Sequence, residues 1–300
     1  MKSLGSKQIF LLAWLTCALA VASAQPVSDS LLSRPVRIWQ NLPDATSLEL
    51  DPEGNLILLE EQAGRLHKFF INTDYDSAIS IGGKSGRQEG FLHLAGASAR
   101  NRQHIYVLDD LARRVVLLST DFQIVGEMDF FSPKTAPGAF IPADEIYPKA
   151  FDTSISGETY VLNQIDNRVY KLDLAGEVRQ RFGGLDYGQG SLLNPAGIAL
   201  SDDNDVWVSD TLAQAFYVYD YFGVFRYRKS ATAGFRWRDF SLYGSLLVYW
   251  NSREVCFEHL PSGKKREYVF PGPALIRDVK LHKDFIYLLL EKEIRMYRWD

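Results

Sequence analysis

Short apolar runs recur along the chain at intervals of 40 to 54 residues, and a polar residue closes each run. The runs are rich in Leu, Ile, Val and Tyr, residue types that favour strands. A repeat of this period is typical of stacked supersecondary units. The six runs are Leu56–Glu61, Ile105–Asp110, Thr159–Gln164, Val206–Thr211, Leu246–Asn251 and Ile286–Glu291.

Each run has the same kind of neighbours. A shorter apolar segment and a polar turn precede it, as in Ser47–Leu50 followed by Asp51–Asn55, and this pair predicts a hairpin. A third and usually a fourth strand follow, as in Arg168–Asp173 and Glu177–Phe182. The unit is a four-stranded antiparallel meander, which is how a propeller blade is built. We therefore predict an all-β chain that forms one six-bladed β-propeller over residues 35–300.

The two ends of this region complement each other. The sixth unit reaches Trp299 and Asp300 after only three strands, and an orphan strand, Val36–Gln40, precedes the first unit. We predict that Val36–Gln40 pairs with Glu293–Arg298 as the outer strand of the last blade. This pairing would close the ring and cover a strand edge that otherwise invites aggregation.

The fourth unit resembles a known repeat. Leu193–Leu200 contains Pro-Ala-Gly-Ile-Ala, and Val206–Thr211 reads Val-Trp-Val-Ser-Asp-Thr, which is similar to the NHL repeat. The third unit follows the pattern more loosely. In the fifth and sixth units, Trp250 and Leu290 stand where the family has Asp. The resemblance implies a propeller, and related six-bladed propellers include gluconolactonase-like hydrolases and a peptide-amidating lyase with metal sites at the channel mouth.

The N-terminus has the layout of a secretory signal peptide. Lys2 and Lys7 precede the apolar run Ile9–Val21, and Ala22–Ala24 supplies small residues before a cut. We interpret residues 1–24 as a signal peptide cleaved after Ala24, and residues 25–34 as a lead-in. The protein is then secreted or periplasmic. Cleavage would leave Cys256 as the one cysteine, in an apolar alternation that favours a buried, inert thiol.

Charge narrows the choice of partners. Without Lys2 and Lys7, the chain has 31 basic and 37 acidic residues, and its one Lys/Arg-rich run is the short Gly263–Arg266 turn. Nucleic acid is therefore not an expected partner. No further apolar stretch is long enough to span a membrane. We expect a monomer.

Function in a propeller is expected on loops carried by the rigid blades. The loops that join the second and third strands of each blade, and those that join successive blades, share one face, which we call the loop face. The loop face carries polar, mostly acidic turns. Glu60, Asp109, Asn163 and Asp210 could hold a hard cation such as calcium with oxygen ligands. The same residues could instead cap the tight turns that follow the strands.

The longest departure from the repeat is Phe130–Pro148, which carries four prolines and several aromatic residues. Insertions in repeat proteins tend to lie on the binding face. The turns on the opposite face, such as Asp51–Asn55, are short and built from residues that the turns require. We therefore predict ligand or partner contacts on the loop face, at Asp109, Arg113, Phe140, Tyr147, Asp166, Asn167 and Asp210.

Catalytic motifs give little support for an enzyme. The chain has no Gly-x-Ser-x-Gly elbow or His-Glu-x-x-His helix, and Gly82–Arg87 is interpreted as a turn between blades rather than a phosphate cradle. None of the five histidines lies on the recurrent loop-face turns. The leading hypothesis is an exported, non-catalytic propeller that binds a protein, peptide or glycan of the cell envelope without a cofactor. The alternative is a calcium-dependent hydrolase or lyase.

Overall fold

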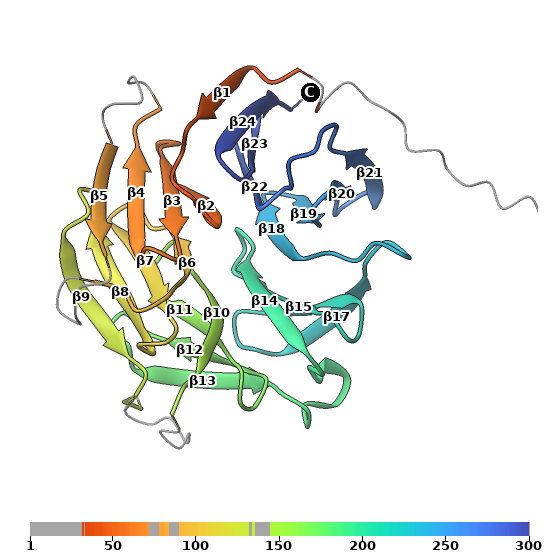
Figure 1. Ribbon diagram of the computed structural model, residues 1–300. Coiled ribbons are helices and arrows are strands. Elements are labelled where there is room, and N and C mark those ends of the chain that lie inside the picture. The colour runs from red at the N-terminus through yellow and green to blue at the C-terminus, as the bar shows by residue number, and fades with distance from the viewer. Residues whose placement is uncertain are drawn as a thin grey trace, which may run out of the picture.

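The computed structural model describes residue 32 and residues 34–71, 78–83, 90–131, 134–135 and 145–299. These residues form six antiparallel sheets of four strands each, with one short 3-10 helix, Gly188–Gly190, among them. The sheets are arranged around a centre as the blades of a propeller (Figure 1). The predicted fold class and blade number are confirmed. The proposed signal peptide lies outside the described residues, and so does most of the lead-in.

The first three blades follow the chain in order, each from its inner to its outer strand. Blade 1 consists of β2 (Ser47–Leu50), β3 (Leu56–Glu60), β4 (Arg65–Phe69) and β5 (Ala78–Gly82). Blade 2 consists of β6 (Leu94–Ser98), β7 (His104–Asp109), β8 (Arg114–Ser119) and β9 (Ile124–Asp129). Blade 3 consists of β10 (Pro148–Thr153), β11 (Thr159–Asn163), β12 (Arg168–Leu172) and β13 (Val178–Gly183).

The remaining three blades complete the ring. Blade 4 consists of β14 (Pro195–Leu200), β15 (Val206–Asp210), β16 (Ala215–Tyr219) and β17 (Phe225–Ser230). Blade 5 consists of β18 (Asp239–Tyr243), β19 (Leu246–Trp250), β20 (Glu254–His259) and β21 (Lys264–Val269). Blade 6 consists of β22 (Asp278–His282), β23 (Phe285–Leu289), β24 (Glu293–Arg298) and β1 (Arg37–Gln40).

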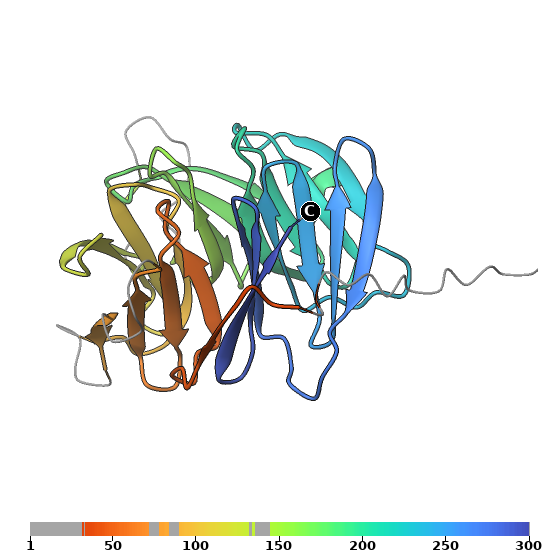
Figure 2. The same cartoon turned by 90° about the horizontal axis from the view of Figure 1, so that it is seen from above.

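Strand β1 closes the ring as predicted. It pairs antiparallel with β24, with Arg37 opposite Met296 and Gln40 opposite Glu293, so it is the outer strand of blade 6. Val36 extends the pairing, because its N–H donates to the carbonyl of Met296 over 2.7 Å. The two ends of the described chain therefore lie in one sheet, where β1 runs beside β24 (Figures 1 and 2).

The hydrophobic core is divided among the interfaces between blades. Strand alternation puts apolar side chains on both faces of each sheet, so neighbouring blades share a buried cluster. The interface of blades 3 and 4, for example, contains Leu162 and Val169 from one sheet and Val208 and Tyr219 from the other. The inner strands also contact one another in a closed circuit, from β2 through β6, β10, β14, β18 and β22 back to β2. This circuit surrounds the centre of the propeller.

Candidate functional site

The loop-face residues with the strongest repeat pattern bind the turns that surround them. Asp210 has no exposed surface, and its carboxylate accepts from the N–H groups of Leu193 (2.6 Å), Asn194 (3.0 Å), Leu212 (3.1 Å) and Ala213 (2.9 Å). It therefore ties the connection that enters blade 4 to the turn between β15 and β16.

Asp109 and Asn163 do the same in the two preceding blades. Asp109 accepts from the N–H groups of Leu92 and His93, at 3.0 and 3.1 Å, and from Ala112 at 3.2 Å. The side-chain oxygen of Asn163 accepts from the N–H of Tyr147 at 2.9 Å. These contacts match the turn-capping alternative for these residues.

A set of predicted site residues meets between blades 2 and 3. The Arg113 guanidinium lies 3.5 Å from the ring centre of Phe131 and 4.5 Å from that of Tyr147. It also pairs with Glu145 at 2.8 Å, and the Tyr147 hydroxyl donates to the same carboxylate at 2.7 Å. The hydroxyl and the guanidinium lower the pKa of Glu145, and the carboxylate raises the pKa of Tyr147. Cation, ring and carboxylate thus hold one another in place.

The other predicted residues continue this arrangement toward blade 4. Asp166 accepts from the Asn163 amide at 2.9 Å and from the Tyr170 hydroxyl at 2.9 Å. The Asn167 amide donates to the carbonyl of Leu193 at 3.2 Å, and Leu193 is itself bound by Asp210. Phe140 lies outside the described residues. The structure therefore joins the other predicted residues through contacts that cross blades 2 to 4, and their role in binding stays a prediction.

The metal ligands of the alternative hypothesis each have local partners. Glu60, for instance, lies 3.1 Å from His67 of its own blade. Within the described ranges, no group of three or more His, Cys, Asp or Glu side chains could hold a metal ion.

Sequence reasoning missed His93 on the loop face. Its Nε2 lies 2.6 Å from Glu61 of blade 1, and its Nδ1 lies 2.6 Å from Asp110 of blade 2. Burial alone would lower the pKa of His93, but its hydrogen bonds to Asp110 and Glu61 raise it. An alignment of Leu92–His93–Leu94 with Leu193–Asn194–Pro195 would have placed this residue on the loop face.

A cavity of about 780 Å³ opens on the opposite face, where the first and second strands of each blade are joined. All six inner strands or the turns after them contribute to its lining. Its walls include Leu50, Phe151, Ile198, Phe240 and Leu242. Concave sites of this size with apolar walls and a few polar groups are typical small-molecule sites. The sequence analysis expected little recognition on this face.

Charged groups at the rim of the cavity are paired. Arg100 follows β6, and its guanidinium donates to the carbonyls of Leu200 and Ser201 and pairs with Asp202 at 3.2 Å. Asp51 pairs with Lys68 at 3.0 Å and also caps its own turn. The Arg100 contacts link blade 2 to blade 4 across the rim, whereas those of Asp51 stay within blade 1.

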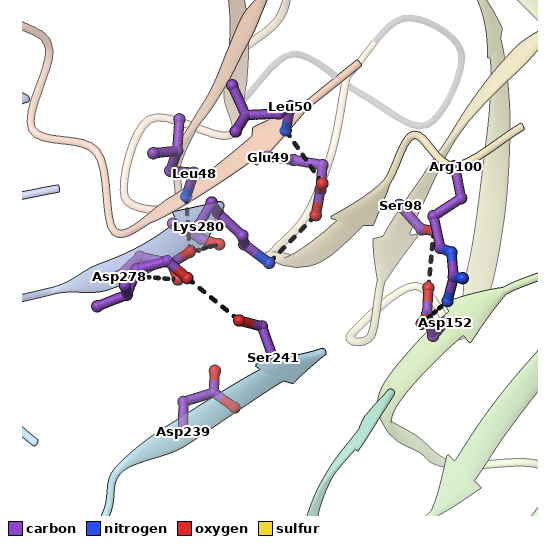
Figure 3. A network of polar contacts seen from close by, with 12 residues as sticks. Leu48, Glu49, Leu50, Ser98, Arg100, Asp152, Asp239, Ser241, Asp278 and Lys280 are labelled. Carbon is purple, nitrogen blue, oxygen red and sulfur yellow. Dashed lines mark hydrogen bonds and ion pairs between the residues drawn. The ribbon is translucent and has the colours of Figure 1, made fainter. Parts of the chain in front are cut away.

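Deeper in the channel the carboxylates outnumber the cations (Figure 3). Glu49 of β2 pairs with Lys280 of β22 at 3.2 Å. Asp278 accepts from the Ser47 hydroxyl at 2.9 Å and from the N–H of Leu48 at 2.8 Å, so it joins blade 6 to blade 1. Asp239 of β18 accepts from the N–H of Phe240 at 2.8 Å, and no other hydrogen bond to it occurs within the described part of the chain.

The pKa values of these groups reflect first their enclosure by the protein and then the charges around them. Enclosure by the protein and the charge of Asp278 raise the pKa of Asp239 to about 6, although the residue is exposed to solvent. Burial also raises the pKa of Glu49, against the effect of Lys280. Burial would lower the pKa of Lys280, yet Glu49, Asp278 and Asp239 raise it.

Comparison with solved structures supports the fold. The chain is similar to a gluconolactonase from Xanthomonas campestris, with TM-score 0.62 and 13% identity over 90% of this chain and 92% of that one. It is similar to a catalytically inactive virginiamycin B lyase from Staphylococcus aureus with quinupristin, with TM-score 0.61 and 12% identity over 88% and 99% of the two chains. YCF48 bound to D1 peptide gives TM-score 0.57 and 7% identity over 89% and 96%.

Because the sequence identities are low, these similarities show a shared propeller fold and no more than that. Propellers of this shape therefore include enzymes and peptide-binding proteins. No family model matches the chain, so membership of an NHL-repeat family stays a prediction. None of the curated proteins matches it in sequence. Among the described residues, no helix is both long and apolar enough to cross a membrane.

Proposed function

We propose that this protein is an exported, non-catalytic propeller that binds a protein or peptide partner through the loop face of blades 2 to 4. The observation that carries the proposal is a row of exposed aliphatic side chains at equivalent positions in three successive blades. Leu111, Ile165 and Leu212 are 68%, 69% and 68% exposed. We call these three residues the aliphatic row.

Each member of the aliphatic row lies two residues after the residue that caps its turn. Leu111 follows Asp109, Ile165 follows Asn163, and Leu212 follows Asp210. Blades 1 and 5 place the polar residues Gln62 and Ser252 in the corresponding turns, so the turn itself does not require an aliphatic residue. Single exposed apolar residues are normal on a protein surface, but a repeated cluster marks an interaction site.

Residues around the aliphatic row fit an interface. Leu92 and Leu193, in the connections that enter blades 2 and 4, are 51% and 47% exposed. Between blades 2 and 3, Arg113 and Tyr147 are held in one geometry by Glu145 and Phe131. Arg113 itself is buried, so the surface offered to a partner is the half-buried Tyr147 and the exposed Phe131 that pack against it. Tyr is among the residue types that contribute most at protein interfaces, and preorganised side chains lose little entropy on binding. The binding of D1 peptide by YCF48 is consistent with this use of the fold.

The contacts of the loop-face carboxylates support a binding role over catalysis. Asp109 and Asp210 are fully buried, and their oxygens accept from backbone N–H groups that would lose their partners if the carboxylates turned to a substrate. A calcium-dependent hydrolase or lyase would require these groups to leave their turns.

The test is site-specific photo-crosslinking on the purified protein in a cell-envelope extract. A photoreactive side chain at position 165 should give a discrete protein adduct, and one at position 174 should give none, because Leu174 lies on the opposite face with a similar exposure of 66%. The triple variant Leu111→Ser, Ile165→Ser, Leu212→Ser should reduce partner capture at least ten-fold with an unchanged melting temperature.

The control for this variant is Ile155→Ser, Leu174→Ser, Phe222→Ser, which removes three exposed apolar side chains from other turns. Capture that survives the first triple variant but not the second would overturn the proposal. The export part is tested separately by mass spectrometry of the secreted protein, which should find Gln25 as its first residue.

A further inference from the structure

We propose that the central cavity is a second site, separate from the loop face, and that it binds a small organic cation: an ammonium or guanidinium group on an apolar body. The cavity opens on the face opposite the aliphatic row, so this inference does not depend on the proposed partner.

Glu49 and Lys280 line the cavity, and Asp239 and Asp278 lie just beyond this lining, so carboxylates outnumber ammonium groups at this end of the cavity. Three carboxylates, Glu49, Asp239 and Asp278, surround one ammonium, Lys280. Asp278 is occupied by the Ser47 hydroxyl and the N–H of Leu48, whereas the second oxygen of Asp239 has no hydrogen bond to the rest of the described chain. A cation would relieve the repulsion among these carboxylates, and an anion would increase it.

Asp239 begins β18 and lies next to the cavity lining, which starts at Phe240 on this strand. Residues two apart on a strand point to the same face, so Asp239 shares the face of Ser241, which lines the cavity. Figure 3 shows the Asp239 carboxylate on the same side of β18 as Ser241, with no dashed contact to a neighbour. On the other side, β14 presents Gly197 there, where a Cβ atom would lie 3.3 Å from the carboxylate. The Phe240 ring and the Ser209 hydroxyl would lie equally close to that Cβ, so glycine lets β14 approach Asp239 closely.

The walls of the cavity are partly apolar, which indicates the kind of body that the ligand should carry. Phe151, Phe240 and Leu242 would contact an apolar body above the charged group. The volume of about 780 Å³ suits a molecule larger than a bare ion. The described residues contain no set of three His, Cys, Asp or Glu side chains suited to a metal ion, which favours an organic cation over a metal.

Protonation of Asp239 should lower the affinity of this site for a cation. The charged groups around it are Asp278 and Lys280 on β22 and the adjacent Arg238. Because the pKa of Asp239 is raised to about 6, its charge is present at pH 8 and largely absent at pH 5. An alkylammonium ligand keeps its proton over this range. Affinity for such a ligand should therefore fall as the pH is lowered.

The experiment is calorimetric titration of the full-length folded protein with three probes of similar shape: benzylamine, benzyl alcohol and benzoate. At pH 8, benzylamine should bind at least ten-fold more tightly than the other two, and its affinity should fall at least five-fold at pH 5. Asp239→Asn and Glu49→Gln should each weaken it at least ten-fold. Asp203→Asn, an exposed acid on the same face outside the cavity lining, should have no effect.

Any of the following results would overturn the inference: benzylamine bound no better than benzyl alcohol, benzoate bound most tightly, or Asp239→Asn and Glu49→Gln both binding normally. Displacement of benzylamine by equimolar calcium would also overturn it, because it would identify a metal site. If either variant fails to fold, as its melting curve will show, the probe series and the pH dependence of the unmodified protein still decide the question.

Discussion

Blades 4 and 5 are neighbours in the ring, and each turns from its second to its third strand at the same position. In blade 4 that position is Asp210, paired with Pro195 of the inner strand, and in blade 5 it is Trp250, paired with Asp239. Asp210 holds its turn with hydrogen bonds to four N–H groups. Trp250 is also buried, but it packs in the apolar cluster between blades 5 and 6.

In blade 5, the residue after Trp250 caps the turn. Asn251 accepts from the N–H groups of Arg253 and Glu254, both at 2.8 Å. The indole N–H of Trp250 has no hydrogen-bond partner among the described residues. This position must therefore fill space at the blade interface. Either a hydrogen-bonded carboxylate or a large apolar ring, with the cap moved to the next residue, can do so. The repeat pattern is therefore weak in blade 5 because a different residue type fills this position and the next residue caps the turn.

The largest effect on stability should come from removing the indole ring of Trp250. Trp250→Ala should lower the free energy of unfolding by about 4 kcal/mol, because it leaves a large cavity in the core. Urea unfolding followed by circular dichroism measures this. Trp250→Phe should cost much less, and a loss below about 1 kcal/mol for the alanine variant would show that the ring is dispensable.

Asp210→Ala should be the next in size. It leaves buried N–H groups without a charged acceptor, and we expect a loss of about 3 kcal/mol in the free energy of unfolding. Asp210→Asn should lose less, since the amide keeps one acceptor oxygen. If the alanine and asparagine variants unfold at the same urea concentration, the carboxylate does not hold the turn in the way described.

Asn251→Ala tests the displaced cap. Its bonds to the two N–H groups are neutral and partly exposed, and its amide also donates to the Glu254 carboxylate at 2.8 Å, so the expected loss is about 1 kcal/mol. The same unfolding assay applies, and Ser252→Ala, one residue further along the turn, is the matched control. A loss as large as that of Asp210→Ala would mean that the two blades cap their turns equally strongly.

The smallest effect has the opposite sign and concerns Asp239, the inner-strand partner of Trp250. Its pKa is raised from 3.8 to about 6 in the folded protein, so the unfolded chain releases this proton at lower pH, and ionisation destabilises the fold as the pH rises through this window. Asp239→Asn should raise the melting temperature by about 1–2 °C at pH 7. The difference should vanish below pH 4. Melting curves from pH 4 to 8 measure it, and a variant that is less stable than the unmodified protein at every pH would contradict the prediction.

Local patterns were enough to predict the blades. The run Val206–Thr211 becomes β15, and the orphan segment before the first unit becomes β1, because alternation and turn residues act over a few positions. The capping alternative for Asp109, Asn163 and Asp210 followed from the same local reasoning, since strand-end carboxylates and amides accept from the N–H groups of tight turns.

The cavity could not be predicted in this way. Its walls come from single residues on six strands, and Glu49 and Lys280, which pair in it, are 231 positions apart in the sequence. No local pattern reports on such a contact. The aliphatic row could have been found in the sequence, because Leu111, Ile165 and Leu212 occupy equivalent turn positions. Its exposure, however, is known only from the structure, which shows the capping residues beneath it to be buried.

The pairing of β1 with β24 sets the order in which the molecule can be completed. During synthesis β1 emerges first, and its partner is made more than 250 residues later. Five blades can form while β1 waits, and the sixth cannot be finished until residues 293–298 are available. Closure of this propeller therefore requires the first and last strands of the described chain together, and any process that acts on the growing chain encounters a ring that is still open.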